Sequence, residues 1–189
     1  MAYLQSSRSS CACSAFGPST APSTHLSTSS MARVFVYGTL KKGQPNYYRM
    51  FDASNGKTEF LGTAKTVEKF PLVIAGVHNI PYLLNIPGQG KQIHGEIYKV
   101  DEPMLKFLDD FEGVPTHYQR TVNKLEVKEC DAQADGETLA PGSITEAYLY
   151  STKTYKPEWT TLPTFDNYDS YGDHGLKAIP ANSLPAYVE

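Results

Sequence analysis

Short apolar runs separated by glycine and proline are the feature of this sequence that most constrains its fold. They recur from residue 34 to residue 150, and several follow one another too closely for the dozen or more residues that a parallel crossover needs. Thirteen tyrosines and thirteen prolines also favour strands and turns over a helical bundle. We therefore expect an α+β domain, with a small, mixed, mostly antiparallel, barrel-like sheet and a few short helices.

Individual elements follow from the spacing of apolar residues. A helix is predicted over residues 101–111, with Asp101 as its N-cap and Gly113 just beyond its end. Its apolar face is formed by Met104, Leu105, Leu108 and Phe111. Residues 128–143 are predicted to be an exposed loop, and no regular element is predicted in the last 35 residues. Strands are predicted at residues 34–36, 60–64, 72–75, 82–84, 93–100, 120–127 and 145–150.

Residues 1–30 differ in composition from the rest of the chain. About a third of them are serine, they include no acidic residue, and their apolar residues show no period. Such a segment cannot bury enough apolar surface to fold, which predicts a disordered leader, residues 1–30, before a folded domain over residues 31–189. Met31 is a usable start. A mitochondrial transit peptide is the alternative, but the segment holds only Arg8, and it has no apolar core of a secretory signal.

Overall charge and cysteine usage exclude several classes of protein. A net charge of −3 argues against a nucleic-acid-binding protein, which needs clustered Lys and Arg. No apolar run approaches the roughly 20 residues that cross a membrane as a helix. Three cysteines, two of them in the leader, do not form a disulfide framework. We expect a cytoplasmic monomer, and composition leaves open whether it is an enzyme or a binder.

An acidic residue at the end of the predicted helix is the first candidate for chemistry. Glu112 follows Asp109 and Asp110, with only Lys106 nearby to offset the three charges. The helix dipole and like charges both raise a carboxyl pKa, and burial raises it further. A glutamate with a raised pKa suits general acid–base catalysis near neutral pH. The alternative is that all three are solvated surface acids.

The second candidate is the turn that ends the first apolar run, formed by Tyr37, Gly38, Thr39 and Leu40. After a buried strand, glycine permits a positive φ and lets successive backbone N–H groups point at one spot. Such a cradle binds an anion or a developing oxyanion. It is not a phosphate loop, because the lysine-containing motif of those loops does not follow. An ordinary strand-ending turn is the alternative.

Other reactive residue types offer no site. No serine lies in a nucleophile elbow, and Cys130 has no neighbouring histidine in the sequence. Glu96 could partner Glu112, although a surface role is the alternative. A zinc site is not predicted, because none of the required spacings is formed by His78, His94, His117 and His174.

Several segments together carry a resemblance to a known family. They are VFVYGTL (34–40), PLVIAG (71–76), HNIPYLLNIPG (78–88) and GEIYKVDEPMLKFLDDFEG (95–113), joined later by YKPEWTTLP and YDSYGDHGL. On these segments the chain resembles the gamma-glutamyl cyclotransferase superfamily. The HNIPYLL and YDSYGDHGL blocks are similar to the branch that acts on gamma-glutamyl amines.

The resemblance implies a fold, a reaction and roles for both candidates. The fold would be a small mixed barrel without cofactor or metal. Glu112 would be the acid–base residue, and the backbone of Tyr37–Leu40 would hold the glutamyl group. The substrate would be a gamma-glutamyl amine, chiefly L-gamma-glutamyl-L-epsilon-lysine from degraded transglutaminase cross-links, and the products would be 5-oxoproline and a free amine. The substrate's own α-amine would be the nucleophile, which accounts for the missing serine or cysteine nucleophile.

Two alternatives stay open at this point. The same reaction could act on other gamma-glutamyl amino acids, because the leaving group could contact loop side chains alone. A barrel that binds a small molecule without turning it over is the other alternative. The carboxylate at a disfavoured position argues against this second alternative, because a binder has no need of it.

Overall fold

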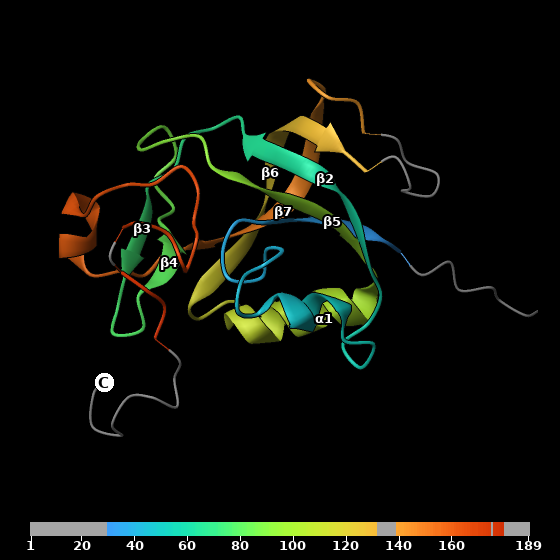
Figure 1. Ribbon diagram of the computed structural model, residues 1–189, viewed down its shortest axis with the longest axis horizontal. Coiled ribbons are helices and arrows are strands. Elements are labelled where there is room, and N and C mark those ends of the chain that lie inside the picture. Colours follow the sequence, from blue (N-terminus) through green and yellow to red (C-terminus); the bar gives the residue numbers. More distant parts are fainter. Residues whose placement is uncertain (1–29, 132–138, 175, 180–189) are drawn as a thin grey trace, which may run out of the picture.

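Five strands form a closed barrel in the computed structural model, which describes residues 30–131, 139–174 and 176–179 (Figure 1). The strand order is β1-β5-β2-β6-β7, with β1 and β7 parallel and every other pair antiparallel. This confirms the predicted α+β class and the mixed, mostly antiparallel barrel. The barrel strands are β1 (Ala32–Val36), β2 (Thr58–Thr66), β5 (His94–Val100), β6 (Tyr118–Cys130) and β7 (Ile144–Thr152).

Smaller elements surround one end of the barrel. A two-stranded sheet of β3 (Leu72–Ala75) and β4 (Ile80–Leu83) stands beside it, and a bridge from Leu84 to Thr152 joins the two. Two short 3-10 helices accompany them, η1 (Tyr47–Phe51) and η2 (Pro157–Thr161). In Figure 1, η1 lies in front of the one α-helix among the described residues, on the same side of the barrel.

The α-helix α1 (Glu102–Glu112) begins and ends where its capping residues require. The Asp101 side chain accepts a hydrogen bond from the backbone N–H of Met104 at 3.0 Å, which satisfies one of the free donors of the first turn. At the other end Gly113 has a φ of 68°, a left-handed conformation that favours glycine, and its N–H caps the last turn. Both capping predictions are confirmed. Glu112 is therefore the last helical residue.

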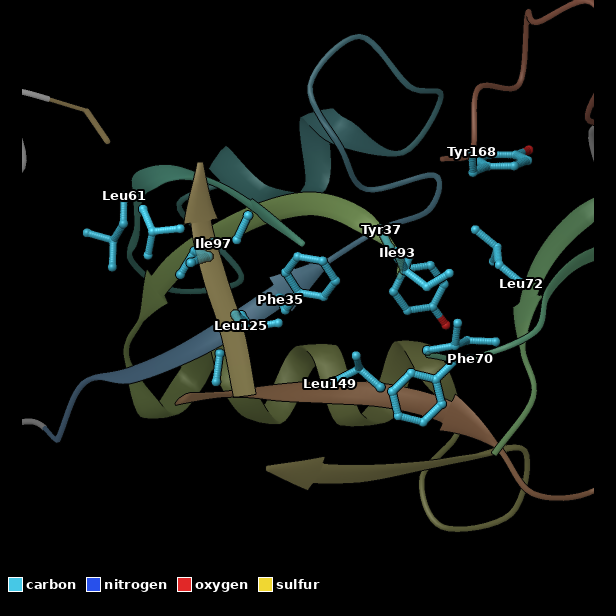
Figure 2. Packing of buried hydrophobic residues seen from close by; sticks show 14 of the residues in the cluster. Phe35, Tyr37, Leu61, Phe70, Leu72, Ile93, Ile97, Leu125, Leu149 and Tyr168 are labelled. Atoms are coloured by element: carbon cyan, nitrogen blue, oxygen red, sulfur yellow. The ribbon is translucent and has the colours of Figure 1, made fainter. Parts of the chain in front are cut away.

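Alternate residues of β1 enter two different cores. Phe35 points into the barrel, where it packs with Leu61, Ile97 and other apolar side chains (Figure 2). Val34 and Val36 face outward, against Met104 and other residues of α1. Because both faces of this strand are covered, consecutive residues are buried, and this explains why its sequence is an unbroken apolar run. At about 25 cal/mol per Å² of apolar surface, these two cores supply the main stabilisation of the fold.

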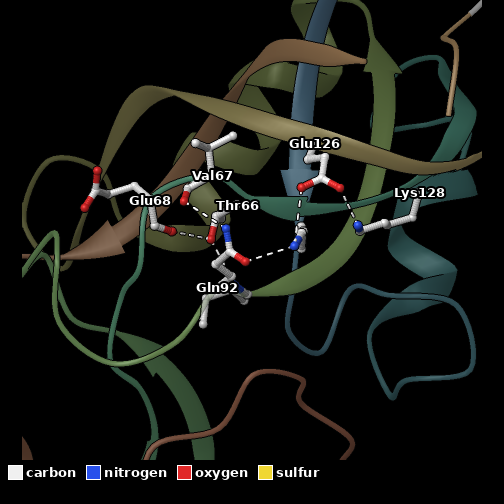
Figure 3. Close-up of polar contacts among 8 residues, drawn as sticks. Thr66, Val67, Glu68, Gln92, Glu126 and Lys128 are labelled. Atoms are coloured by element: carbon white, nitrogen blue, oxygen red, sulfur yellow. Dashed lines mark hydrogen bonds and ion pairs between the residues drawn. The ribbon is translucent and has the colours of Figure 1, made fainter. Parts of the chain in front are cut away.

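Polar contacts at the end of β2 connect this strand to the chain just before β5 (Figure 3). The Thr66 hydroxyl donates to the carbonyl of Glu68 at 2.6 Å and accepts from the N–H of Ile93 at 2.9 Å. Nearby, Glu126 pairs with Lys128 across the outside of the barrel. Exposed ion pairs contribute only about 0–1 kcal/mol to stability. The hydrogen bonds of the buried Thr66 hydroxyl therefore contribute more to stability than the ion pair does.

Three predictions differ from the structure or lie beyond it. The 128–143 loop begins later than predicted, because β6 continues to Cys130, which pairs with Gly62, and Leu139 is buried. The polar residues on the outer face of β6 hid its length. A 3-10 helix also lies in the region where no element was predicted. The predicted leader lies outside the described residues apart from residue 30, so the 30/31 domain boundary stays a prediction.

Candidate active site

A pocket of about 330 Å³ opens where β1 and α1 both end. It brings together the two candidates of the sequence, Glu112 and the 37–40 turn, although they are far apart in the chain. Its size is within the range of small-molecule sites. The lining residues are Val34, Phe35, Val36, Tyr37, Gly38, Thr39, Leu40, Asn46, Ile80, Pro81, Tyr82, Leu108, Phe111, Glu112, His117, Tyr118 and Tyr150.

Glu112 is the one carboxylate among these lining residues. Its side chain is half-buried and makes no hydrogen bond or ion pair with any residue that the structure describes. Burial in this apolar surrounding disfavours the charged form and raises the pKa of the carboxyl to about 7. An isolated carboxyl with such a pKa can both accept and donate a proton at neutral pH.

The predicted raising of this pKa is confirmed. Burial, one of the predicted causes, raises it, whereas the neighbouring acids are not among the causes. Asp109 is neutralised by Arg120 at 2.7 Å and accepts a hydrogen bond from the Tyr150 hydroxyl at 2.8 Å. Asp110 lies near Lys106, 3.9 Å away. Both neighbouring acids are therefore paired outside the pocket, and desolvation raises the Glu112 pKa.

The 37–40 turn presents free backbone donors at the pocket. Its chain reverses through a hydrogen bond from the N–H of Lys41 to the carbonyl of Gly38 at 3.1 Å. The N–H groups of Gly38, Thr39 and Leu40 have no acceptor among the described residues, so they are available to a ligand. A positive φ at Gly38 was predicted and is wrong, because this residue is not among the glycines with that conformation. Glycine is needed instead because a Cβ would meet Pro81 at 3.0 Å.

Tyr37 connects the turn to the strand beside it. Its buried hydroxyl donates to the carbonyl of Tyr150 on β7 at 2.8 Å. Burial raises the pKa of Tyr37 well above its ordinary value, and the nearby charge of Glu112 raises it further. Tyr37 is therefore a neutral hydroxyl close to Glu112, fixed in place by a backbone acceptor.

The opposite wall of the pocket is aromatic, and sequence reasoning did not assign it. Tyr82 stacks on Tyr118 with parallel rings 6.2 Å apart, and Trp159 of η2 packs on Tyr82 at 4.4 Å. The Tyr118 hydroxyl donates to the carbonyl of Pro81 at 3.3 Å. Burial raises the pKa of Tyr118 well above its ordinary value. The HNIPYLL block that contains Tyr82 was the available signal.

Two polar lining residues were also missed as site residues. The Asn46 side chain donates to the Thr39 hydroxyl at 3.0 Å, which supports the turn from behind. His117 lies in the pocket wall, where a side chain at Gly113 would meet its ring at 2.7 Å. The spacing of histidines in the sequence does not predict that His117 lines the pocket, because the chain reversal after α1 brings it there.

Glu96 does not join Glu112. It accepts hydrogen bonds from the N–H of Lys42 at 2.9 Å and from the Tyr98 hydroxyl at 2.8 Å, outside the pocket. Within the described ranges, no three His, Cys, Asp or Glu side chains are grouped so that they could hold a metal ion. No helix in that part of the chain is long and apolar enough to cross a membrane.

Known proteins resemble this chain over the whole barrel. Residues 34–170 match the family described as gamma-glutamyl cyclotransferase, AIG2-like. Gamma-glutamylaminecyclotransferase of Rattus norvegicus is 55% identical over 79% of this chain and 97% of its own length, and the Homo sapiens protein of that name is 51% identical over the same shares. A crystal structure of an AIG2-like protein from Mus musculus, 53% identical, matches 79% of this chain and 96% of that one with a TM-score of 0.73. This chain belongs to the gamma-glutamyl cyclotransferase family.

Proposed function

We propose that this protein is a gamma-glutamylamine cyclotransferase whose main substrate is L-gamma-glutamyl-L-epsilon-lysine, the isodipeptide left when transglutaminase cross-links are digested. The products are 5-oxoproline and lysine. Relatives that are 51–55% identical and carry this enzyme name support the activity. The choice of the isodipeptide rests on the sequence blocks that resemble the amine branch.

One observation carries the proposed mechanism. A single carboxylate and the backbone N–H groups of the 37–40 turn, which have no acceptor among the described residues, belong to one small pocket, and neither serine nor cysteine is among its lining residues. This set suits a reaction in which the substrate attacks itself. Holding a flexible glutamyl chain in a near-cyclic conformer removes much of the entropic barrier to ring closure.

The reaction begins at the α-ammonium of the glutamyl group. Glu112, as carboxylate, takes a proton from this nitrogen, which then attacks the γ-carbonyl carbon and closes a five-membered ring. The carbonyl oxygen becomes an oxyanion, and the N–H groups of Gly38, Thr39 and Leu40 are the available donors to it. Collapse of this intermediate breaks the bond to the ε-nitrogen of lysine.

Proton transfer balances around Glu112. The α-nitrogen begins as an ammonium and ends as a lactam N–H, so it loses two protons. The ε-nitrogen begins as an amide N–H and leaves as an ammonium, so it gains two. Glu112 relays these protons one at a time and ends as the carboxylate that it was at the start. A carboxyl with a pKa of about 7 is suited to both directions of transfer.

The test is turnover of the isodipeptide by the wild-type protein and by Glu112→Gln. We expect the wild type to release 5-oxoproline and lysine in equal amounts. We expect the variant to lose at least a factor of about 10²–10⁴ in kcat, the usual contribution of a general acid–base group. The glutamine keeps the shape of the side chain, so circular dichroism should be unchanged. Full turnover by a folded variant would remove Glu112 from the mechanism.

Substrate choice is tested separately. Rates on the isodipeptide and on gamma-glutamyl-alanine should differ in favour of the isodipeptide. Higher kcat/KM on gamma-glutamyl-alanine would assign the enzyme to gamma-glutamyl amino acids instead. Binding of 5-oxoproline without release of product from any gamma-glutamyl compound would make the protein a binder.

A further inference from the structure

Arg49 contacts two residues that line the pocket. It belongs to η1, which lies in front of α1 (Figure 1). Its guanidinium carbon is 5.2 Å from the centre of the Phe111 ring, and its Nε is 3.4 Å from the side-chain oxygen of Asn46. Phe111 and Asn46 both line the pocket. A cation is thereby held beside two residues of the pocket lining.

In the described part of the chain, no acceptor contacts the terminal N–H groups of this guanidinium, and only its Nε is hydrogen-bonded. Its carbon also lies over the Tyr48 ring at 5.1 Å, so aromatic rings hold the group in place through cation–π contact. No described acid pairs with Arg49, and the two acids near the end of α1, Asp109 and Asp110, pair with Arg120 and Lys106. The free edge of a planar guanidinium matches a carboxylate with two parallel hydrogen bonds.

We propose that Arg49 binds the α-carboxylate of the amino acid that leaves as the free amine. This assignment rests on the proposed function. Glu112 and the N–H groups of the 37–40 turn are assigned to the glutamyl half, so the amine half extends toward the opening. Its methylene chain then passes the Phe111 ring, and its carboxylate reaches Arg49. The site thus selects gamma-glutamyl derivatives whose amine carries a carboxylate over those of simple alkyl amines.

A matched pair of substrates isolates this carboxylate. L-gamma-glutamyl-cadaverine equals the isodipeptide without the α-carboxylate of lysine and keeps the terminal ammonium. With Arg49→Gln, we expect KM for the isodipeptide to rise about tenfold, as for loss of one exposed charge-assisted hydrogen bond pair. KM for the cadaverine compound should be unchanged, and kcat should be retained for both, because the lost contact is remote from the reacting atoms.

Two further variants control for charge and packing. Arg49→Lys keeps the charge but not the planar fork, and should raise KM for the isodipeptide by less than the glutamine variant does. Lys57→Gln removes an exposed cation at the other end of α1 and should leave KM unchanged for both substrates. An equal rise for both substrates would overturn the assignment, since Arg49 would then act on the glutamyl half or through Asn46. No change with either substrate would overturn it as well.

Binding measurements separate this proposal from the proposed function. Calorimetry on Glu112→Gln and on the double variant with Arg49→Gln gives Kd for both compounds without any turnover. We expect the double variant to bind the isodipeptide about tenfold more weakly and the cadaverine compound equally well. Absence of cyclisation by the wild type would count against the proposed function alone, whereas equal Kd values for the isodipeptide would overturn the carboxylate site.

Discussion

Glu112 combines a charge-bearing group with a place that solvates charge poorly, and this combination makes activity depend on pH. In the proposed mechanism its carboxyl must be ionised to take a proton from the substrate, and its pKa is about 7. We therefore expect kcat/KM to fall about tenfold per unit of pH below 7. A pH–rate profile on the isodipeptide measures this, and NMR titration of the Glu112 carboxyl carbon gives the pKa directly. An acid limb near pH 4.5 would contradict the expectation.

The same burial should lower stability at neutral pH. The folded-state pKa of about 7 is above the ordinary value of 4.5, so the native state holds more protons between these values. The free energy of unfolding then falls as pH rises from 4.5 to 7 and is level above that. The Glu112→Gln variant has no carboxyl to titrate, so its free energy of unfolding does not fall in this way. The difference in free energy of unfolding between the variant and the wild type should therefore grow with pH, to at most about 3 kcal/mol above pH 7. Urea unfolding at pH 4.5 and pH 8 checks this, and a constant difference would contradict it.

At the scale of elements, the loop that follows β1 is held by a segment from near the other end of the chain. The side-chain oxygen of Gln44 accepts from the N–H and the hydroxyl of Ser170, at 2.8 and 2.7 Å, and its amide donates to Asp169 at 3.1 Å. Lys41 donates to Asn167 at 2.5 Å. The turn that we propose to supply the oxyanion donors is thus anchored by residues 167–170.

Removing this anchor should loosen the turn. Gln44→Ala leaves the nearly buried Ser170 without its acceptor, which costs about 1–3 kcal/mol of unfolding free energy. Because the N–H groups must be fixed before the oxyanion forms, kcat should fall more than KM rises. Urea unfolding and steady-state kinetics measure both effects, with Lys42→Ala as an exposed control. Full kcat in a destabilised Gln44 variant would limit the anchor to a structural role.

Sequence periodicity predicted most of these elements, because it depends on local burial. The run at β1 and the capped helix α1 each carry their own signal, and both candidates at their ends reach the pocket. The aromatic wall carried no such signal. Tyr82 and Tyr118 meet only because β4 packs beside the start of β6, and that contact depends on tertiary structure. The anchor at Gln44 joins residues 126 positions apart and was unpredictable for the same reason.

At the scale of the whole molecule, barrel closure makes the first described strand indispensable. β1 pairs with β5 on one side and with β7 on the other, so it joins the two edges of the sheet. Ala32, its first residue, already pairs with Val100. The family match begins at residue 34, and the relatives align with about 150 residues of this chain. We therefore predict that the folding unit begins close to residue 31.

A shortened chain tests that boundary. We expect residues 31–189 alone to unfold at the same urea concentration as the full chain, because every strand pair of the barrel is retained. Its kcat/KM on the isodipeptide should also be unchanged, since all residues that line the pocket remain. A second truncation that starts at residue 37 removes β1, opens the sheet and should not fold. Loss of stability or activity in the 31–189 chain would mean that residues before Met31 belong to the catalytic domain.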